Sequence, residues 1–264
     1  MRFYSIRLYL LTIPIVCSLV SFAALADPAK ELMERSEKAT KSHTEHTTYR
    51  MDLLNQDGKV EQTRTSEYFY KRNDDEERTL QKFTDPPVLR GSGMLIIDRG
   101  KVVNDIWMYL PTTRRLRRIA GTEKSNRYMG TEFTYEDFED YQIPYYHFTL
   151  LAHSPCDADE KCIQVEAVPS AAQERKASGY SRKVYWIGEQ TLYPRRIDYY
   201  DHDGKQVKTL RDEGLERVGG YWRAKLHKME NKVTGRSTAI TILSREVDQP
   251  LRDYFVSKRY LRKD

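Results

Sequence analysis

Two charge clusters of opposite sign lie close together in the middle of the chain. Four arginines occur within five residues, and five acidic residues follow about fifteen positions later; these are Arg114, Arg115, Arg117 and Arg118, then Glu132, Glu136, Asp137, Glu139 and Asp140. On a strand, Arg115 and Arg117 would share one face. Two interpretations stay open. The charges pair across neighbouring strands and remain solvated, or the arginines form a rim that binds phosphate-bearing headgroups or an acidic partner.

Aromatic residues are the second group with a suggestive spacing. Strand alternation would place Trp107 and Tyr109 on one face, and likewise Phe133 and Tyr135, with Phe138 close behind. Such residues are ordinary sheet core, or they line an apolar concavity when a curled sheet is too large to fill its own interior. We expect these five rings to line a ligand-holding concavity, with Arg115 and Arg117 near its rim.

The chain contains none of the common catalytic signatures, such as HExxH, GxSxG, a P-loop, GxGxxG or SxxK. His43 and His46 are the closest histidine pair, but no cysteine or third histidine lies nearby to complete a metal site. We therefore predict neither an enzyme nor a metal or other cofactor. Nucleic acid is not expected as a partner either, because the net charge is only +5 and the N-terminal residues, described next, predict export from the cytoplasm.

The first 26 residues have the pattern of a secretory signal peptide. Arg2 and Arg7 precede an apolar run, and Ala24-Leu25-Ala26 offers small residues at the positions that a signal peptidase reads. Cleavage is predicted after Ala26. Because Cys17 follows the bulky Val16, we do not expect a lipidated cysteine.

Only two cysteines follow the signal peptide. In an oxidising compartment, Cys156 and Cys162 are well placed for a disulfide that closes a short local loop.

The remaining chain, residues 27–264, reads as one β-rich domain. Overall, 39% of the 264 residues are hydrophobic and 31% are charged, which excludes collagen-like and polytopic membrane proteins. A short helix over residues 28–42 precedes strand candidates that recur without crossover helices, and Asp57-Gly58 and Asp203-Gly204 mark two hairpins. About ten or eleven successive antiparallel strands predict a sheet that curls into a barrel or part-barrel with a few covering helices.

The chain resembles the outer membrane lipoprotein-sorting protein family, the LolA-like periplasmic carriers, over about residues 30–260. The matching features are I-W-M-Y-L-P at 106–111, R-R-L-R-R-I at 114–119, F-T-Y-E-D at 133–137, and Tyr193-Pro194 before a strand. The resemblance implies a half-open barrel whose hydrophobic cavity receives acyl chains in the periplasm. It also implies work beside an RND- or MMPL-type inner-membrane exporter.

The resemblance therefore predicts a periplasmic carrier that moves lipids or lipoproteins between envelope membranes. The competing hypothesis is an interaction or stress-sensing module that uses the same barrel to bind a protein without transport.

Overall fold

The structure, a computed structural model, describes residues 27–140, 142–156 and 160–263. The predicted signal peptide and its cleavage site lie outside these residues. The helix α1 (Pro28–Thr40) begins at the first described residues, where the Asp27 carboxylate accepts hydrogen bonds from the backbone N–H groups of Ala29 and Lys30. This N-cap satisfies two amide groups that have no partner within the helix.

Most of the chain forms one antiparallel sheet of thirteen strands among the described residues. In chain order, its strands are β1 (Thr44–Leu54), β2 (Val60–Arg72), β3 (Glu77–Asp85), β4 (Gly93–Asp98), β5 (Asp105–Leu110), β6 (Arg115–Ile119), β7 (Tyr146–Pro155), β8 (Lys161–Pro169), β9 (Arg182–Gly188), β10 (Pro194–Tyr200), β11 (Gln206–Glu213), β14 (Leu226–Asn231) and β15 (Ser237–Val247). A separate hairpin joins β12 (Glu216–Val218) and β13 (Tyr221–Arg223).

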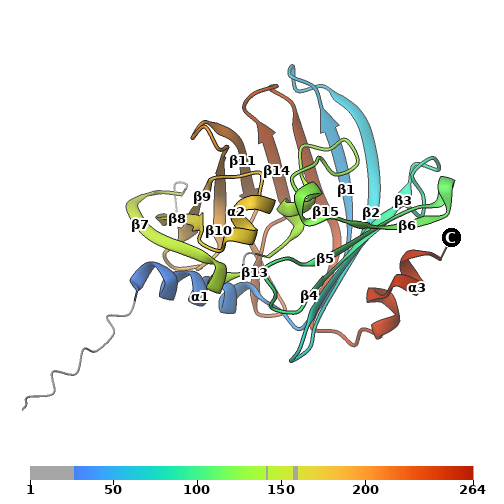
Figure 1. Ribbon diagram of the computed structural model, residues 1–264, viewed down its shortest axis with the longest axis horizontal. Helices are drawn as coiled ribbons and strands as arrows, with labels where there is room; N and C mark the ends of the chain where they lie inside the picture. The colour runs from blue at the N-terminus through green and yellow to red at the C-terminus, as the bar shows by residue number, and fades with distance from the viewer. Residues whose placement is uncertain (1–26, 141, 157–159, 264) are drawn as a thin grey trace, which may run out of the picture.

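The sheet consists of two meanders joined by its first and last strands. The spatial order runs β6-β5-β4-β3-β2-β1-β15-β14-β11-β10-β9-β8-β7, with β1 paired to β15 in the middle. The strands curl around a common interior, but β6 and β7 do not pair with each other, so the barrel is half-open (Figure 1). This is the predicted architecture.

Two hydrophobic layers lie on opposite faces of the β1–β6 half. Tyr49, Met94 and Met108 belong to the concave cluster. Leu95, Ile97 and their neighbours form a separate cluster on the convex face, under the C-terminal segment. All six residues of β4 are buried because both of its faces are covered.

Short helices cover the remaining surfaces. α1 packs with the β7–β9 side of the sheet, α2 (Ala172–Ala177) lies over the interior, and α3 (Lys258–Leu261) lies outside the barrel (Figure 1). The 3-10 turns are η1 (Pro111–Thr113), η2 (Gly121–Glu123), η3 (Tyr135–Phe138), η4 (Ile143–Tyr145) and η5 (Asp253–Val256).

The structure has more strands than the sequence predicts. The strand β7 was not expected because most of its residues are exposed and show no regular alternation. Before β15 the chain forms two short strands in close succession, β13 and β14, which belong to different sheets.

A disulfide joins Cys156 to Cys162, as predicted, with the Cα atoms 5.1 Å apart. It closes the loop between β7 and β8 at one edge of the sheet. Loop closure stabilises the native state by restricting the unfolded chain, and a loop this short gives a modest effect.

We expect the Cys156→Ser, Cys162→Ser double variant to lose about 2 kcal/mol of unfolding free energy, the chain-entropy value for a seven-residue loop. Urea denaturation of the oxidised protein and of the variant measures this difference. An unchanged midpoint would show that the bridge does not restrain the unfolded state.

Candidate functional site

The interior of the half-open barrel is crossed by a segment without regular strands. This crossing segment, residues 120–140, leaves β6 and runs over the concave face through η2 and η3 (Figure 1). Tyr128 is fully buried at its centre and stacks on Phe83 of β3, with ring centroids 5.9 Å apart. The crossing segment is therefore part of the core and not a surface loop.

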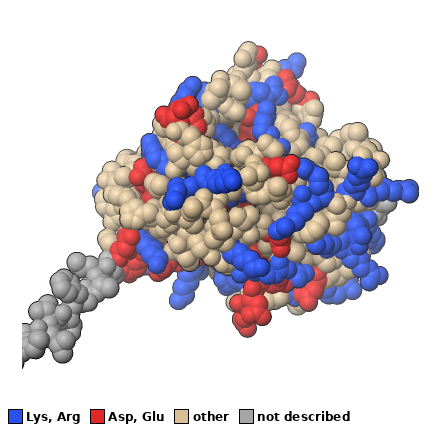
Figure 2. All heavy atoms as spheres, viewed as in Figure 1, with Lys and Arg blue, Asp and Glu red and all other residues tan. Residues whose placement is uncertain are grey.

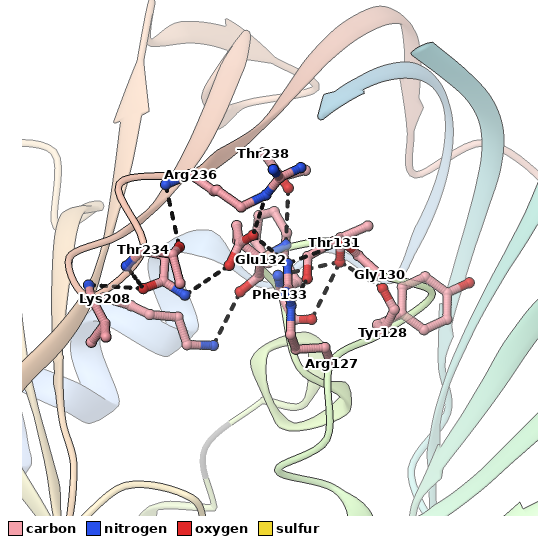
Figure 3. Close-up of polar contacts among 12 residues, drawn as sticks. Arg127, Tyr128, Gly130, Thr131, Glu132, Phe133, Lys208, Thr234, Arg236 and Thr238 are labelled. Atoms are coloured by element: carbon pink, nitrogen blue, oxygen red, sulfur yellow. Dashed lines mark hydrogen bonds and ion pairs between the residues drawn. The ribbon is translucent and has the colours of Figure 1, made fainter. Parts of the chain in front are cut away.

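Glu132 fixes the crossing segment to the far side of the barrel. Its backbone N–H donates to Thr238 Oγ1 of β15 at 3.0 Å, and its carbonyl accepts from Lys208 Nζ of β11 at 3.2 Å. Its carboxylate accepts from Asn231 Nδ2 at 2.8 Å and pairs with Arg127. Figure 3 shows Glu132 at the centre of these contacts.

Two further carboxylates of the crossing segment pair with buried lysines of the sheet. Glu136 lies 3.2 Å from Lys183 Nζ of β9 and accepts a hydrogen bond from Ser178 Oγ at 2.5 Å. Asp137 lies 2.8 Å from Lys208 Nζ and accepts from Tyr180 OH at 2.8 Å. These pairs are charge-assisted and shielded from water, so each partner depends on the other.

The pKa shifts follow from this pairing. Burial alone would raise the pKa of Asp137, but the ammonium groups of Lys208 and Lys183 outweigh it, and the pKa lies below its ordinary value. Burial would also lower the pKa of Lys183, and the carboxylates of Glu136 and Asp137 raise it instead.

Lys124 has two carboxylate neighbours, and its ammonium group lies closer to one of them than to the other. Its Nζ lies 2.8 Å from both oxygens of Glu174 but 3.3 Å from Glu139 Oε2. Burial raises the pKa of Glu139 to about 7, with Glu136 and Glu174 adding to the shift and Lys124 opposing it. Glu139 therefore keeps its proton to a higher pH than an ordinary glutamate does.

A cavity of about 390 Å³ remains between the crossing segment and the sheet. This volume lies in the range of about 300–1,000 Å³ that small-molecule sites occupy. The apolar part of its lining consists of rings and aliphatic side chains from four strands and the crossing segment: Tyr49, Tyr68, Phe133, Phe138, Leu210, Ile240 and Ile242.

One end of the same cavity is charged. Glu45 of β1 lies 3.0 Å from Arg223 Nε and 2.9 Å from Arg245 Nε. Nearby, Asp212 accepts from Tyr193 OH at 2.7 Å and lies 2.8 Å from His227 Nδ1. The alternating inward positions of β1 thus lead from a charged end at Glu45 to an apolar end at Tyr49.

The five expected aromatic residues divide between two places. Phe133 and Phe138 line the cavity, and Tyr135 belongs to the same concave cluster without lining it. Trp107 and Tyr109 share a face as predicted, but it is the convex one, where they pack with the C-terminal segment. The expected alternation of Phe133 and Tyr135 on a strand is wrong, because η3 begins at Tyr135.

The arginine cluster does not pair with the acidic cluster. Arg117 lies 2.7 Å from Glu123, and Arg118 pairs with Asp105 of β5. Arg115 is exposed on β6, the edge strand farthest from the cavity in the first meander, and neither Arg115 nor Arg117 lines the cavity. The expectation of a rim at these two positions therefore does not describe this cavity.

The chain is similar to one family model and to several solved structures. A family model described as "Uncharacterized protein" matches residues 75–263. A putative outer membrane lipoprotein-sorting protein domain from Vibrio parahaemolyticus is 26% identical, with a TM-score of 0.82 over 89% of this chain and 99% of that one. The chain belongs to the LolA-like family.

Two further solved structures are similar to this chain. A DUF1329 family protein from Desulfovibrio piger is 26% identical, with a TM-score of 0.81 over 89% of this chain and 98% of that one. A LolA superfamily protein from Nitrosomonas europaea shares the fold at 18% identity, with a TM-score of 0.67 over 88% and 98% of the two chains. No curated protein matches the chain significantly.

In this LolA-like chain, the charged end of the cavity was not found from the sequence. Arg223 and Arg245 both bind Glu45, from which they are separated by about 180 and 200 residues. No local sequence pattern links these residues. They meet because β1, the first strand of the sheet, pairs with β15, the last.

The described residues of this LolA-like chain contain neither a candidate metal cluster nor a candidate membrane-spanning helix. No group of three or more His, Cys, Asp or Glu side chains could hold a metal ion in residues 27–140, 142–156 and 160–263. His46 stacks on Phe69 with ring centroids 4.5 Å apart. Within the same ranges, no helix is both long and apolar enough to cross a membrane.

The raised pKa of Glu139 predicts a pH-dependent stability. Between the ordinary pKa of 4.5 and about 7, the native carboxyl keeps its proton while the unfolded one releases it. The free energy of unfolding should therefore fall as pH rises through this window. Glu139→Gln should remove this fall and stabilise the protein at pH 8 by about 3 kcal/mol.

Urea denaturation across the pH range measures this effect, and Glu136→Gln is the matched control. Glu136 is the buried partner of Lys183, so its loss should destabilise the protein at pH 8 by about 3–5 kcal/mol. If Glu139→Gln also destabilised the protein at pH 8, Glu139 would have to be ionised and well paired.

Proposed function

We propose that this protein is a periplasmic, non-enzymatic carrier that holds the acyl chains of a lipid or lipoprotein and moves them between envelope membranes. The observation that carries the proposal is the cavity of about 390 Å³ on the concave face, with rings and aliphatic side chains at one end and charged groups at the other. An acyl chain with a polar headgroup has the same division of apolar and polar parts.

The energetics favour reversible loading. Burial of an acyl chain gains about 0.8 kcal/mol per methylene, and removal of that chain from a membrane costs about the same amount. The net affinity is then a small difference between two large quantities. An apolar lining of rings and aliphatic side chains suits such exchange because it makes few directional contacts.

The contact residues follow from the cavity. We assign Phe133, Phe138 and Tyr68 to the acyl chain, because they line the apolar end, and the Arg223–Glu45–Arg245 group to the headgroup side. Trp107 and Tyr109 have no place in this site. The name of the Vibrio relative, a lipoprotein-sorting domain, supports a lipoprotein as one class of cargo. An RND- or MMPL-type partner stays a prediction from the resemblance.

Ile242→Trp tests the cavity directly. Ile242 lines its apolar end, so an indole at this position should occupy the volume that the acyl chain needs. Each displaced methylene costs about 0.8 kcal/mol, so the loss of two lowers lipid affinity about tenfold. Mass spectrometry of organic extracts from natively purified protein gives the lipid content, and thermal unfolding reports stability.

The neighbouring Leu243→Trp is the matched control, because Leu243 is 56% exposed and does not line the cavity. We expect normal lipid content in Leu243→Trp and a stable but lipid-poor Ile242→Trp. Equal lipid content in the two stable variants would contradict the carrier site. An extract without lipid from the unmodified protein would favour the interaction module instead.

A further inference from the structure

Six basic side chains without an acidic partner gather at one end of the molecule, on and beside the edge strand β6 and in the C-terminal segment. We call this group the basic end: Arg114, Arg115, Lys258, Arg259, Arg262 and Lys263. Among the described residues, none of the six has a carboxylate within 4.0 Å. By contrast, Arg117 and Arg118 on the same strand are paired.

The two chain segments that form the basic end are in contact through the convex face of the sheet. Lys258 Nζ lies 3.3 Å from the ring centroid of Trp107 on β5, the strand that pairs with β6. Lys82 of β3 donates to the carbonyl of Tyr260 in α3 at 3.3 Å. Figure 2 shows Lys and Arg side chains crowded at the right-hand end, where Figure 1 places β6 and the C-terminal segment.

The charge is concentrated at this end and is not a general property of the surface. The whole chain carries a net charge of only +5, which is less than the six unpaired cations supply. The rest of the molecule is therefore close to neutral, and the molecule has a strong electrostatic polarity.

Two of these cations lie over aromatic rings. Arg259 lies over the ring of Tyr254 at 5.8 Å, and Lys258 lies over the half-buried Trp107. Tryptophan and tyrosine prefer the boundary between water and a bilayer, whereas lysine and arginine are attracted to anionic headgroups. At a membrane surface, the rings and the cations would therefore both lie at the level of the lipid headgroups.

We propose that the basic end docks the protein on an anionic phospholipid membrane. The docking surface is the outer edge of the sheet at β6 together with the C-terminal segment, and none of its six side chains lines the cavity, so it orients the molecule without occupying the lipid site. The contact is electrostatic and therefore reversible, as a shuttle requires. It does not depend on the cavity, since a protein that carried no lipid could dock in the same way.

Vesicle flotation tests the proposal with purified protein and vesicles of phosphatidylcholine alone or with phosphatidylglycerol. We expect binding only to the vesicles with phosphatidylglycerol, and its loss in 1 M salt, where the screening length falls to about 3 Å. One cation near an anionic surface changes the partition coefficient about fivefold, so Arg114→Gln, Arg115→Gln, Arg259→Gln should lower it roughly 100-fold.

The matched control removes three exposed lysines elsewhere, Lys59→Gln, Lys176→Gln, Lys205→Gln, and should bind nearly as well as the unmodified protein. Equal loss in both triple variants, or equal binding to neutral vesicles, would overturn the proposal. So would binding to polyglutamate without binding to vesicles, which would assign the surface to an acidic polypeptide. Ile242→Trp should still dock, which separates this proposal from the carrier site.

Discussion

The structure depends on buried ion pairs between the crossing segment and the sheet. Lys183 and Lys208 extend from neighbouring parts of the sheet into the barrel, where they meet Glu136 and Asp137. An unpaired charge at such depth costs several kcal/mol, so each pair holds only if both partners stay in place. The pairs therefore determine the path of residues 120–140, and with it the positions of Phe133 and Phe138.

The cavity is a consequence of the same arrangement. A thirteen-stranded sheet curls around more space than a single crossing segment can fill. On the convex face, the C-terminal segment covers the sheet, and Leu95 and Leu261 are fully buried there. A smaller space of about 210 Å³ remains beside Phe69 and Phe255, so the larger apolar space is the concave one of about 390 Å³.

Much of the fold could be predicted from local patterns. The bounds of β4 and β5 match runs of mostly apolar residues, and Asp57-Gly58 and Asp203-Gly204 mark the hairpins β1–β2 and β10–β11. β7 could not be found, because an exposed edge strand has no buried face to impose alternation. The disulfide was predictable because it is local and only two cysteines follow the signal peptide.

The site was less accessible to prediction, for physical reasons. Trp107 and Tyr109 were rightly placed on one face of β5, but β5 is apolar on both faces, so its sequence does not tell which one is concave. Phe133 reaches the cavity from an irregular segment whose path is set by lysines about 50 and 75 residues away.

Photo-crosslinking with an acyl chain that carries a diazirine near its end tests the carrier site most directly, because it reports which side chains surround the lipid. We predict labelled peptides containing Tyr68, Phe133 or Ile242; labelling confined to Trp107 and Phe255 on the convex face would contradict the account.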